Sequence, residues 1–144
     1  MSAVLRAYGA EFAVDEYVAD CKLPICAVIR RGEPVFPNTQ PNGRRHEQSG
    51  VHIIVSDAEF EQFPQQVEDA IAFLNRENDQ LRALCQFPGV EAARLDFGVA
   101  RRDVAVQCDY LPPDLIRIAS ELGLGVEISL YWAVDEPPAR ASES

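Results

Sequence analysis

The amino-acid sequence predicts an α+β fold, with a mainly antiparallel sheet and two main helices packed on one face. Short runs with period-two alternation indicate strands that have one buried and one wetter face. Two apolar stripes with three- and four-residue spacing indicate helices that cover a sheet. The predicted order is strand, short helix, strand, long loop, strand, helix, strand, strand, helix, strand.

The start of the chain predicts two strands with a short helix between them. The apolar run over residues 3–14 indicates a strand that bulges or bends at Gly9. Asp15 is placed to cap a short helix, and Pro24 would stop that helix. Residues 25–29 then form a second apolar run, which we interpret as a strand.

The middle of the chain predicts a third strand and the first main helix. Residues 51–55 form a β-branched run, and Ser56-Asp57-Ala58-Glu59 has the form of a capping box, which predicts a short helical turn. Pro64 is suited to the first turn of the helix that follows. The apolar stripe of this helix consists of Val67, Ala70, Ile71, Leu74, Leu81, Leu84 and Cys85.

The last part of the predicted fold is a hairpin, a helix and a strand. The alternating runs over 95–99 and 104–110 indicate the two strands of the hairpin. A second main helix opens at Pro112-Pro113-Asp114 and ends at Gly123, where a left-handed cap is expected. The final strand is predicted over 126–132.

Length and composition favour a single domain. A chain of 144 residues with 47% apolar residues can form one packed core, which we place at residues 1–133. Residues 134–144, acidic and rich in proline, are expected to be a disordered tail. The charged first twenty residues do not predict a secretion signal, and no apolar run is long enough for a membrane span. We therefore expect a cytoplasmic protein.

The charge balance bears on the class of partner. Thirteen basic and twenty-three acidic side chains give a net charge of −10. A negative field repels phosphate backbones and anionic lipids, so we expect no nucleic-acid or membrane partner and favour a basic protein partner. The one locally positive segment holds Arg30, Arg31, Arg44 and Arg45.

Familiar linear motifs of enzymes and metal sites are absent from the sequence. The four cysteines are far apart and are expected to be reduced and buried, and the two histidines lack the close paired spacing of a zinc site. There is no glycine-rich phosphate loop, Gly-x-Ser-x-Gly elbow or His-Glu-x-x-His sequence. We predict no metal and no cofactor, and the question of catalysis stays open.

Two places could carry chemistry, and each has a plainer interpretation. In the long irregular segment over 37–50, Arg44 and Arg45 could hold a carboxylate or phosphate, and His46 could titrate near neutral pH; the plainer interpretation is a solvated loop. The strand alternation also predicts a polar outer sheet face, which serves as a binding platform, a dimer contact or simply wet sheet. Its predicted members are His52, Arg94, Asp96, Gln107, Asp109, Glu127, Ser129 and Tyr131.

Short patches of sequence, in a fixed order over about residues 3–132, carry a resemblance to a known family. They are Gly9 and Phe12, Asp15-Glu16-Tyr17, Arg30-Arg31-Gly32-Glu33-Pro34, Ser49-Gly50-Val51 to Ser56, Gln65 and Leu74, and Leu111-Pro112 through Leu122-Gly123-Leu124 to Ser129-Leu130-Tyr131. Through them the chain resembles a family of small bacterial proteins classed as a domain of unknown function. The resemblance implies a small α+β sheet domain without established activity, cofactor or catalytic residues. It also implies a size and context similar to those of immunity proteins.

Three hypotheses about function follow. The first is a non-catalytic, immunity-like interaction protein whose charge of −10 steers it toward a basic partner. The second is a small-molecule-binding protein or enzyme, in which the 37–50 loop folds over the outer sheet face. The third is a homodimer formed through that face.

Overall fold

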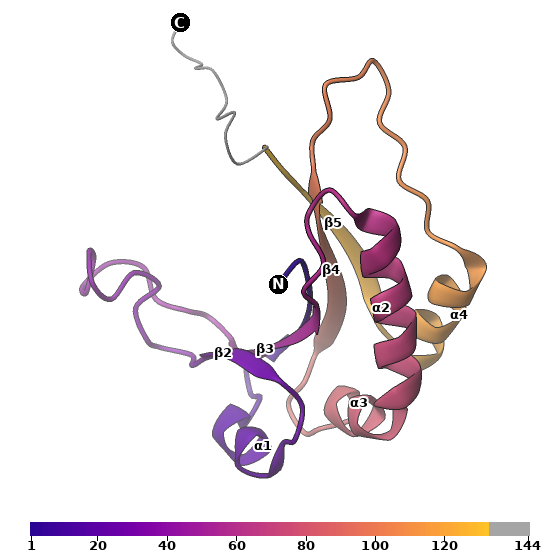
Figure 1. Cartoon of the computed structure of the whole chain (residues 1–144). Helices are drawn as coiled ribbons and strands as arrows, with labels where there is room; N and C mark the ends of the chain where they lie inside the picture. The colour runs from indigo at the N-terminus through magenta and orange to yellow at the C-terminus, as the bar shows by residue number, and fades with distance from the viewer. Residues whose placement is uncertain (133–144) are drawn as a thin grey trace, which may run out of the picture.

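The computed structural model describes residues 1–132 of the chain, and it has the predicted α+β class. The predicted tail, residues 134–144, lies outside the described residues. The described part of the chain forms five strands and four helices (Figure 1). In chain order they are β1 (Ala3–Gly9), α1 (Val14–Asp20), β2 (Ile25–Ile29), β3 (Ser49–Ser56), α2 (Phe63–Arg76), α3 (Asn78–Cys85), β4 (Ala92–Ala100), α4 (Pro113–Leu122) and β5 (Gly125–Tyr131).

The strands form one mixed, mostly antiparallel sheet in the order β2-β3-β1-β4-β5. Only the β4–β5 pair is parallel, because α4 provides the crossover connection that a parallel pair needs. β1 lies in the centre, so that Ala7 is opposite Val51 of β3 and Ala93 of β4. Each residue of β1 from Ala3 to Tyr8 therefore belongs to a row that runs across three strands.

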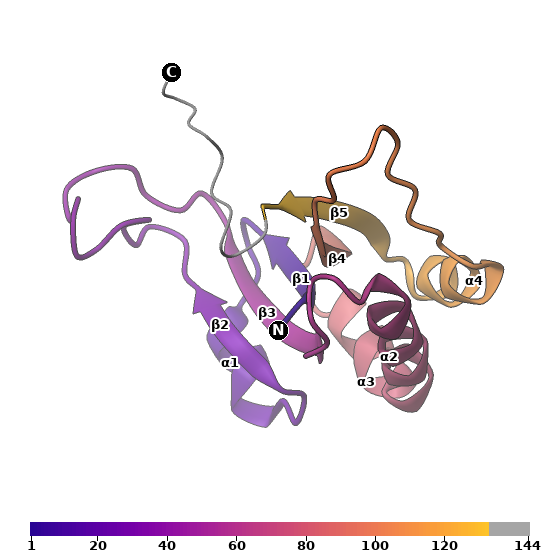
Figure 2. The same cartoon turned by 45° about the horizontal axis from the view of Figure 1, so that its top comes forward.

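The two faces of the sheet have different surroundings. Along β1, Leu5 and Ala7 are buried in the core, whereas Arg6 and Tyr8 alternate with them and point to the opposite side. We call this opposite side the outer face. Figure 2 shows α2, α3 and α4 together below the sheet, and α1 below β2. No helix within residues 1–132 is long and apolar enough to span a membrane.

The predicted long helix is present as two helices. α2 ends at Arg76 and α3 begins at Asn78, with Glu77 between them as the capping residue of both. The apolar stripe nevertheless continues through the break, because Leu74 and Leu81 are both fully buried. The structure thus has four helices in its described part where the sequence indicated two main ones and a short one.

The predicted hairpin strand over 104–110 is wrong. Residues 101–112 form an irregular segment between β4 and α4, which we call the 101–112 arm. β5 lies beside β4 on the side away from β1, where the second hairpin strand was expected, and residues 104–110 form no strand. Val106 and Tyr110 are consequently about three-quarters exposed, at 73% and 74%.

Two predicted caps are also wrong. The segment after Ser56 has a single turn at residues 60–61, closed by the Gln62 N–H and the Glu59 carbonyl, and Ser56 does not cap it. The Ser56 hydroxyl donates to Asp69 Oδ2 over 2.6 Å and accepts the Ala58 N–H over 3.1 Å. Asp15 lies in the first turn of α1 rather than at its cap, where it forms an ion pair with Arg30. In both places the polar side chain contacts a residue that is distant in sequence, Asp69 for Ser56 and Arg30 for Asp15.

The first strand ends at Gly9 instead of bending there. A Cβ atom added to Gly9 would lie 1.9 Å from the carbonyl oxygen of Gly89, so only glycine permits this close approach of two backbone segments. By contrast, Gly123 ends α4 in the left-handed conformation that the sequence predicts, with φ of 80°.

Candidate functional site

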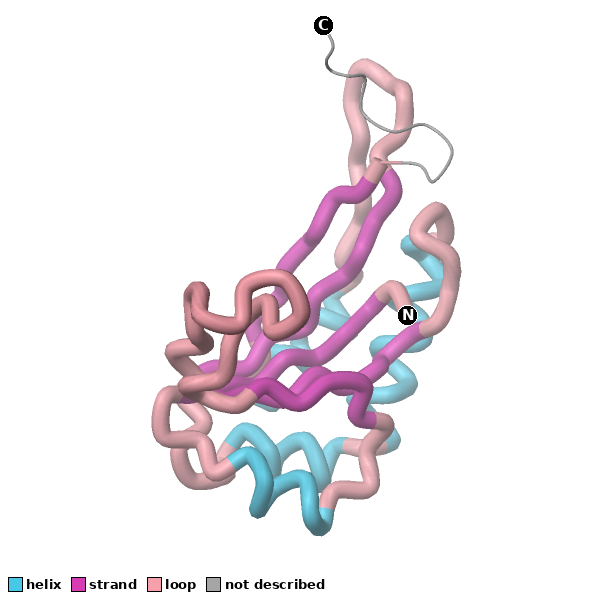
Figure 3. Tube along the Cα trace, turned by 90° about the vertical axis from the view of Figure 1, so that its left-hand side faces the viewer, coloured by secondary structure: helices cyan, strands magenta, loops and turns pink. Residues whose placement is uncertain are grey.

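A hollow lies on the outer face, where the 30–48 loop meets the sheet. Figure 3 shows this loop curled in front of the strands, and in Figure 2 it rises on the side opposite α2 and α3. The hollow has a volume of about 510 Å³, and we call it the outer-face groove. It is lined by Arg6, Ala7, Tyr8, Ile29, His46, Glu47, Gln48, Ser49, Gly50, His52, Arg94 and Glu127.

The strand register brings three basic side chains into one row. Arg6 of β1 pairs with His52 of β3 on one side and with Arg94 of β4 on the other. Cβ atoms of such directly opposed residues lie about 5 Å apart, so the three side chains are neighbours on the same face. Two guanidinium groups this close repel each other unless acidic groups lie beside them.

Asp96 neutralises the first of these guanidinium groups. Arg6 Nη2 lies 3.0 Å from Asp96 Oδ2, and the Ser129 hydroxyl donates to Asp96 Oδ1 over 2.7 Å. The Asp96 side chain is only 5% exposed, whereas that of Arg6 is 40% exposed. The buried Nε of Arg6 has no hydrogen-bond partner among the described residues. This donor is therefore unused, and it is buried from solvent.

Glu127 and Tyr8 hold the second guanidinium group. Arg94 Nη1 lies 3.2 Å from Glu127 Oε1, and Arg94 Nη2 donates to the Tyr8 hydroxyl. The same guanidinium carbon lies 5.4 Å from the centre of the Tyr8 ring. The hydrogen bond to Glu127, followed by the charge interaction with Tyr8, raises the pKa of Arg94. Arg94 is thus a permanent, oriented cation at the groove wall.

His52 is kept mostly uncharged at neutral pH. It is half-buried, and this burial, followed by the positive charge of Arg6, lowers its pKa from the ordinary value of 6.5; the nearby charge of Asp96 acts in the opposite direction. A neutral imidazole can accept one hydrogen bond and donate another. His52 therefore offers both functions to a molecule in the groove.

The 30–48 loop brings His46 to the groove because its base is a narrow backbone ladder. The N–H of His46 donates to the Glu33 carbonyl and the N–H of Gly32 donates to the His46 carbonyl, both over 2.9 Å. An isolated bridge between Pro34 and Arg45 continues this ladder. The loop is therefore ordered beside the groove by its own hydrogen bonds.

The groove contains part of the predicted site. His46, His52, Arg94 and Glu127 line it, Asp96 pairs with Arg6, and Ser129 donates to Asp96. The other predicted residues lie elsewhere in the structure. Neither Arg44 nor Arg45 lines the groove, and Arg45 Nη1 donates to the Gly32 carbonyl within the loop. Asp109 forms an ion pair with Arg102 in the 101–112 arm. The ring of Tyr131 stacks on that of Phe60.

Arg6 and Tyr8 were missed in the sequence. They alternate with Leu5 and Ala7, so strict period-two counting along β1 would have placed them on the outer face with His52. The predicted strand was instead treated as one apolar run that extended past Gly9. Arg6, which lies between His52 and Arg94 in the row, was therefore not predicted as a site residue.

The composition of the groove indicates which chemistry it can perform. Guanidinium and imidazole groups recognise carboxylates and phosphates, and the guanidinium fork does so with two parallel hydrogen bonds. Within residues 1–132, no group of three or more His, Cys, Asp or Glu side chains is placed to hold a metal ion. Comparisons of the chain with protein-family models, curated proteins and solved structures found no match.

Proposed function

We propose that the outer-face groove binds a small organic anion that carries a carboxylate or phosphate group. The observation that supports this most directly is that Arg6, His52 and Arg94, which lie in one row across three strands, all line a hollow of about 510 Å³. A volume of this size is in the range of small-molecule sites, about 300–1,000 Å³. The Arg6 side chain is 40% exposed, so part of it remains accessible to such an anion.

The anion would compete with side chains that already neutralise the arginines. Asp96 is buried and also accepts from Ser129, so it stays with Arg6. Glu127 is 41% exposed and can swing into water, so the Arg94–Glu127 pair is the one that opens to accept a ligand. Binding would therefore replace the Glu127 carboxylate on Arg94 with the carboxylate or phosphate group of the ligand.

This exchange defines the test. We would titrate the protein with phosphate, succinate and citrate at 150 mM salt and follow backbone amide signals by NMR. At least one probe should shift the signals of Arg6, His52 and Arg94. Arg94→Gln should weaken its binding about tenfold or more, since a hydrogen bond to a charged group contributes about 1.5–3 kcal/mol. Glu127→Gln should strengthen binding about threefold, because it removes the competing carboxylate.

The control is Arg117→Gln, which removes an equal charge from an exposed ion pair with Asp114 on α4. It should leave the affinity unchanged. If no probe shifts the groove signals, or if Arg94→Gln and Arg117→Gln weaken binding equally, the proposal is wrong.

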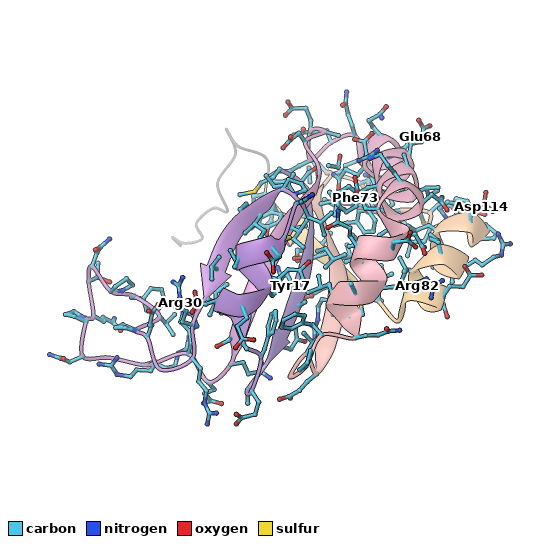
Figure 4. All side chains as sticks on the ribbon, turned by 90° about the horizontal axis from the view of Figure 1, so that it is seen from below. Tyr17, Arg30, Glu68, Phe73, Arg82 and Asp114 are labelled. Atoms are coloured by element: carbon cyan, nitrogen blue, oxygen red, sulfur yellow. The ribbon has the colours of Figure 1, made fainter. Side chains whose placement is uncertain are left out.

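A second proposed function is interaction with a basic protein partner, and a specific feature of the helical side favours it. A hollow of about 320 Å³ lies between α1 and α3, with Tyr17 and Phe87 among its lining residues. Figure 4 shows Tyr17 on the side of α1 that faces α3, and its ring lies 5.3 Å from that of Phe87. The carboxylates of Glu16, Asp20 and Asp79 also line this hollow.

These three carboxylates are exposed and form no ion pair within residues 1–132. An apolar floor with an acidic rim fits a partner segment that carries an apolar side chain among lysines or arginines. The net charge of −10 would steer such a partner toward the protein.

The test is capture of a basic partner at low salt, followed by release at moderate salt. Combined Glu16→Gln, Asp20→Asn and Asp79→Asn substitutions should abolish capture. The control combines Glu61→Gln, Glu68→Gln and Glu121→Gln, which change the net charge equally at exposed positions outside the hollow. Retention of a partner at high salt, or equal loss with both triple variants, would exclude this interaction site.

A further inference from the structure

β5 is an edge strand with unusually apolar exposed side chains. It pairs with β4 on one side, and no strand within residues 1–132 pairs with its other side. Ile128 is 39% exposed and Leu130 is 56% exposed. An open strand edge with apolar side chains tends to pair with another chain unless something covers or interrupts it. In the described part of β5 there is no proline, lysine or bulge that would prevent pairing.

From this edge we propose that two copies of the protein associate through antiparallel pairing of their β5 strands, which joins the two sheets into one. The pairing has a two-fold axis perpendicular to the sheet, beside Ile128. In this arrangement the helices of both copies lie on the same side of the joined sheet, and so do the two outer faces.

The sequence of β5 complements itself in this register. Ile128 lies opposite Ile128 of the second copy, and Val126 lies opposite Leu130, so that the helix-side positions are all apolar. On the outer face, Glu127 lies opposite Ser129. If the axis moved by one residue to Glu127, two glutamates would lie directly opposite each other, which is unfavourable. The charge pattern therefore disfavours the register centred on Glu127.

The 101–112 arm adds apolar surface next to this edge. A hollow of about 380 Å³ has Ile128, Leu130 and Val104 among its lining residues. The arm is braced by its own contacts, since Gln107 Nε2 donates to the Ala100 carbonyl over 3.1 Å and Arg102 forms an ion pair with Asp109. Figure 1 shows the arm extending beyond the ends of β4 and β5. A second copy at the β5 edge would come near this exposed surface, which a seven-residue strand alone does not provide.

Two measurements test the pairing. The first is sedimentation velocity of the full chain between 1 and 200 μM, which should give a species of twice the 16.0 kDa chain mass at the upper end. Ile128→Lys places two like charges beside the axis and should weaken dimerisation at least tenfold, so that the monomer predominates throughout. The control Ile116→Lys changes a similarly exposed isoleucine on α4 and should leave the dimer intact.

The second measurement does not depend on the lysine variant folding well. In a Cys108→Ser background, Ile128→Cys places two thiols beside the two-fold axis, within the distance at which a disulfide forms. Mild oxidation should crosslink these chains, whereas Ser120→Cys on α4 should give no crosslink. A monomer at 200 μM would overturn the proposal. So would a dimer that survives a folded Ile128→Lys variant, or a Ser120→Cys crosslink as efficient as that of Ile128→Cys.

Discussion

The ion pair between Arg6 and Asp96 allows an asymmetric prediction for two single substitutions. Arg6→Met should destabilise the fold more than Asp96→Asn, although both remove the same interaction. The difference in cost depends on which charged group remains after the substitution. Arg6→Met leaves a carboxylate that is 5% exposed and keeps only the hydrogen bond from Ser129, whereas Asp96→Asn leaves a guanidinium that is 40% exposed and is solvated by water.

The magnitudes follow from this difference in exposure. An uncompensated buried charge costs about 3–5 kcal/mol, so we expect Arg6→Met to lower the free energy of unfolding by about 3 kcal/mol. The freed guanidinium of Asp96→Asn is screened by water, and its cost should be about 1 kcal/mol. For a chain of this size the corresponding decreases in Tm are about 10 °C and about 3 °C. The double variant should cost less than the sum of the single variants, by about 1 kcal/mol or more.

The assay is urea unfolding followed by circular dichroism, with the slope m compared among variants to check that each unfolds in one transition. Arg76→Met is a suitable control, since its ion pair with Glu77 is local and exposed at the arginine. Equal costs for Arg6→Met and Asp96→Asn, or a larger cost for Asp96→Asn, would refute the argument from burial. An additive double variant would show that the pair is not coupled.

Three further predictions concern stability. Gly9→Ala should lower the free energy of unfolding in urea by about 3 kcal/mol, because the added Cβ would lie 1.9 Å from a backbone oxygen. The control Gly125→Ala, whose added Cβ has its nearest neighbour at 3.9 Å, should lower it by under about 1 kcal/mol, and equal decreases would contradict the prediction. Gln66→Glu should cost more than Gln66→Met, about 3 against about 1 kcal/mol, because the fully buried Gln66 amide donates to the Gly98 carbonyl over 2.7 Å and a carboxylate cannot. The lowered pKa of His52 means that its contribution to stability is complete above pH 6.5 and is lost as the pH falls through the lower folded value. His52→Gln should therefore lose less stability than the wild type between pH 7 and 5, and a loss as steep as that of the wild type would count against a neutral His52.

The elements that the sequence predicted well are those set by local periodicity. The stripe that includes Val67, Leu74 and Leu81 identified the helical face that packs against the sheet, even though the helix is divided at Glu77. Gly123 identified the end of α4, because only a left-handed residue suits that turn. Such signals depend on residues a few positions apart, and they need no knowledge of the neighbours in space.

The elements that were predicted wrongly depend on which segments become neighbours in the folded structure. Residues 104–110 alternate as well as β5 does, but only one strand can lie on the side of β4 away from β1, and the α4 crossover places β5 there. Alternation shows that a segment can form a strand; it does not show that a partner edge is free. Asp109 was assigned to the outer face for this reason, and the structure places it in the 101–112 arm.

The same difference between local pattern and distant neighbours explains which predicted site residues lie at the groove. His52 and Arg94 lie on strands, where alternation fixes the direction of each side chain, and both line the groove. Arg44 and Arg45 lie in a loop, where direction depends on the backbone ladder between the two sides of that loop. No sequence pattern encodes that ladder, and neither arginine lines the groove.

β5 connects the groove to the free edge of the sheet. Its residues Glu127 and Ser129 hold Arg94 and Asp96 in the groove, while the opposite edge of the same strand is unpaired within residues 1–132. An edge strand with one neighbour opens more easily than an interior strand, and its opening would release the Glu127 carboxylate from Arg94 and the Ser129 hydroxyl from Asp96 together. Pairing with a second β5 would supply the missing neighbour. The proposed dimer and the proposed anion site would then share one structural element, so that a molecule which replaces Glu127 on Arg94 would act on the strand proposed to join the two copies.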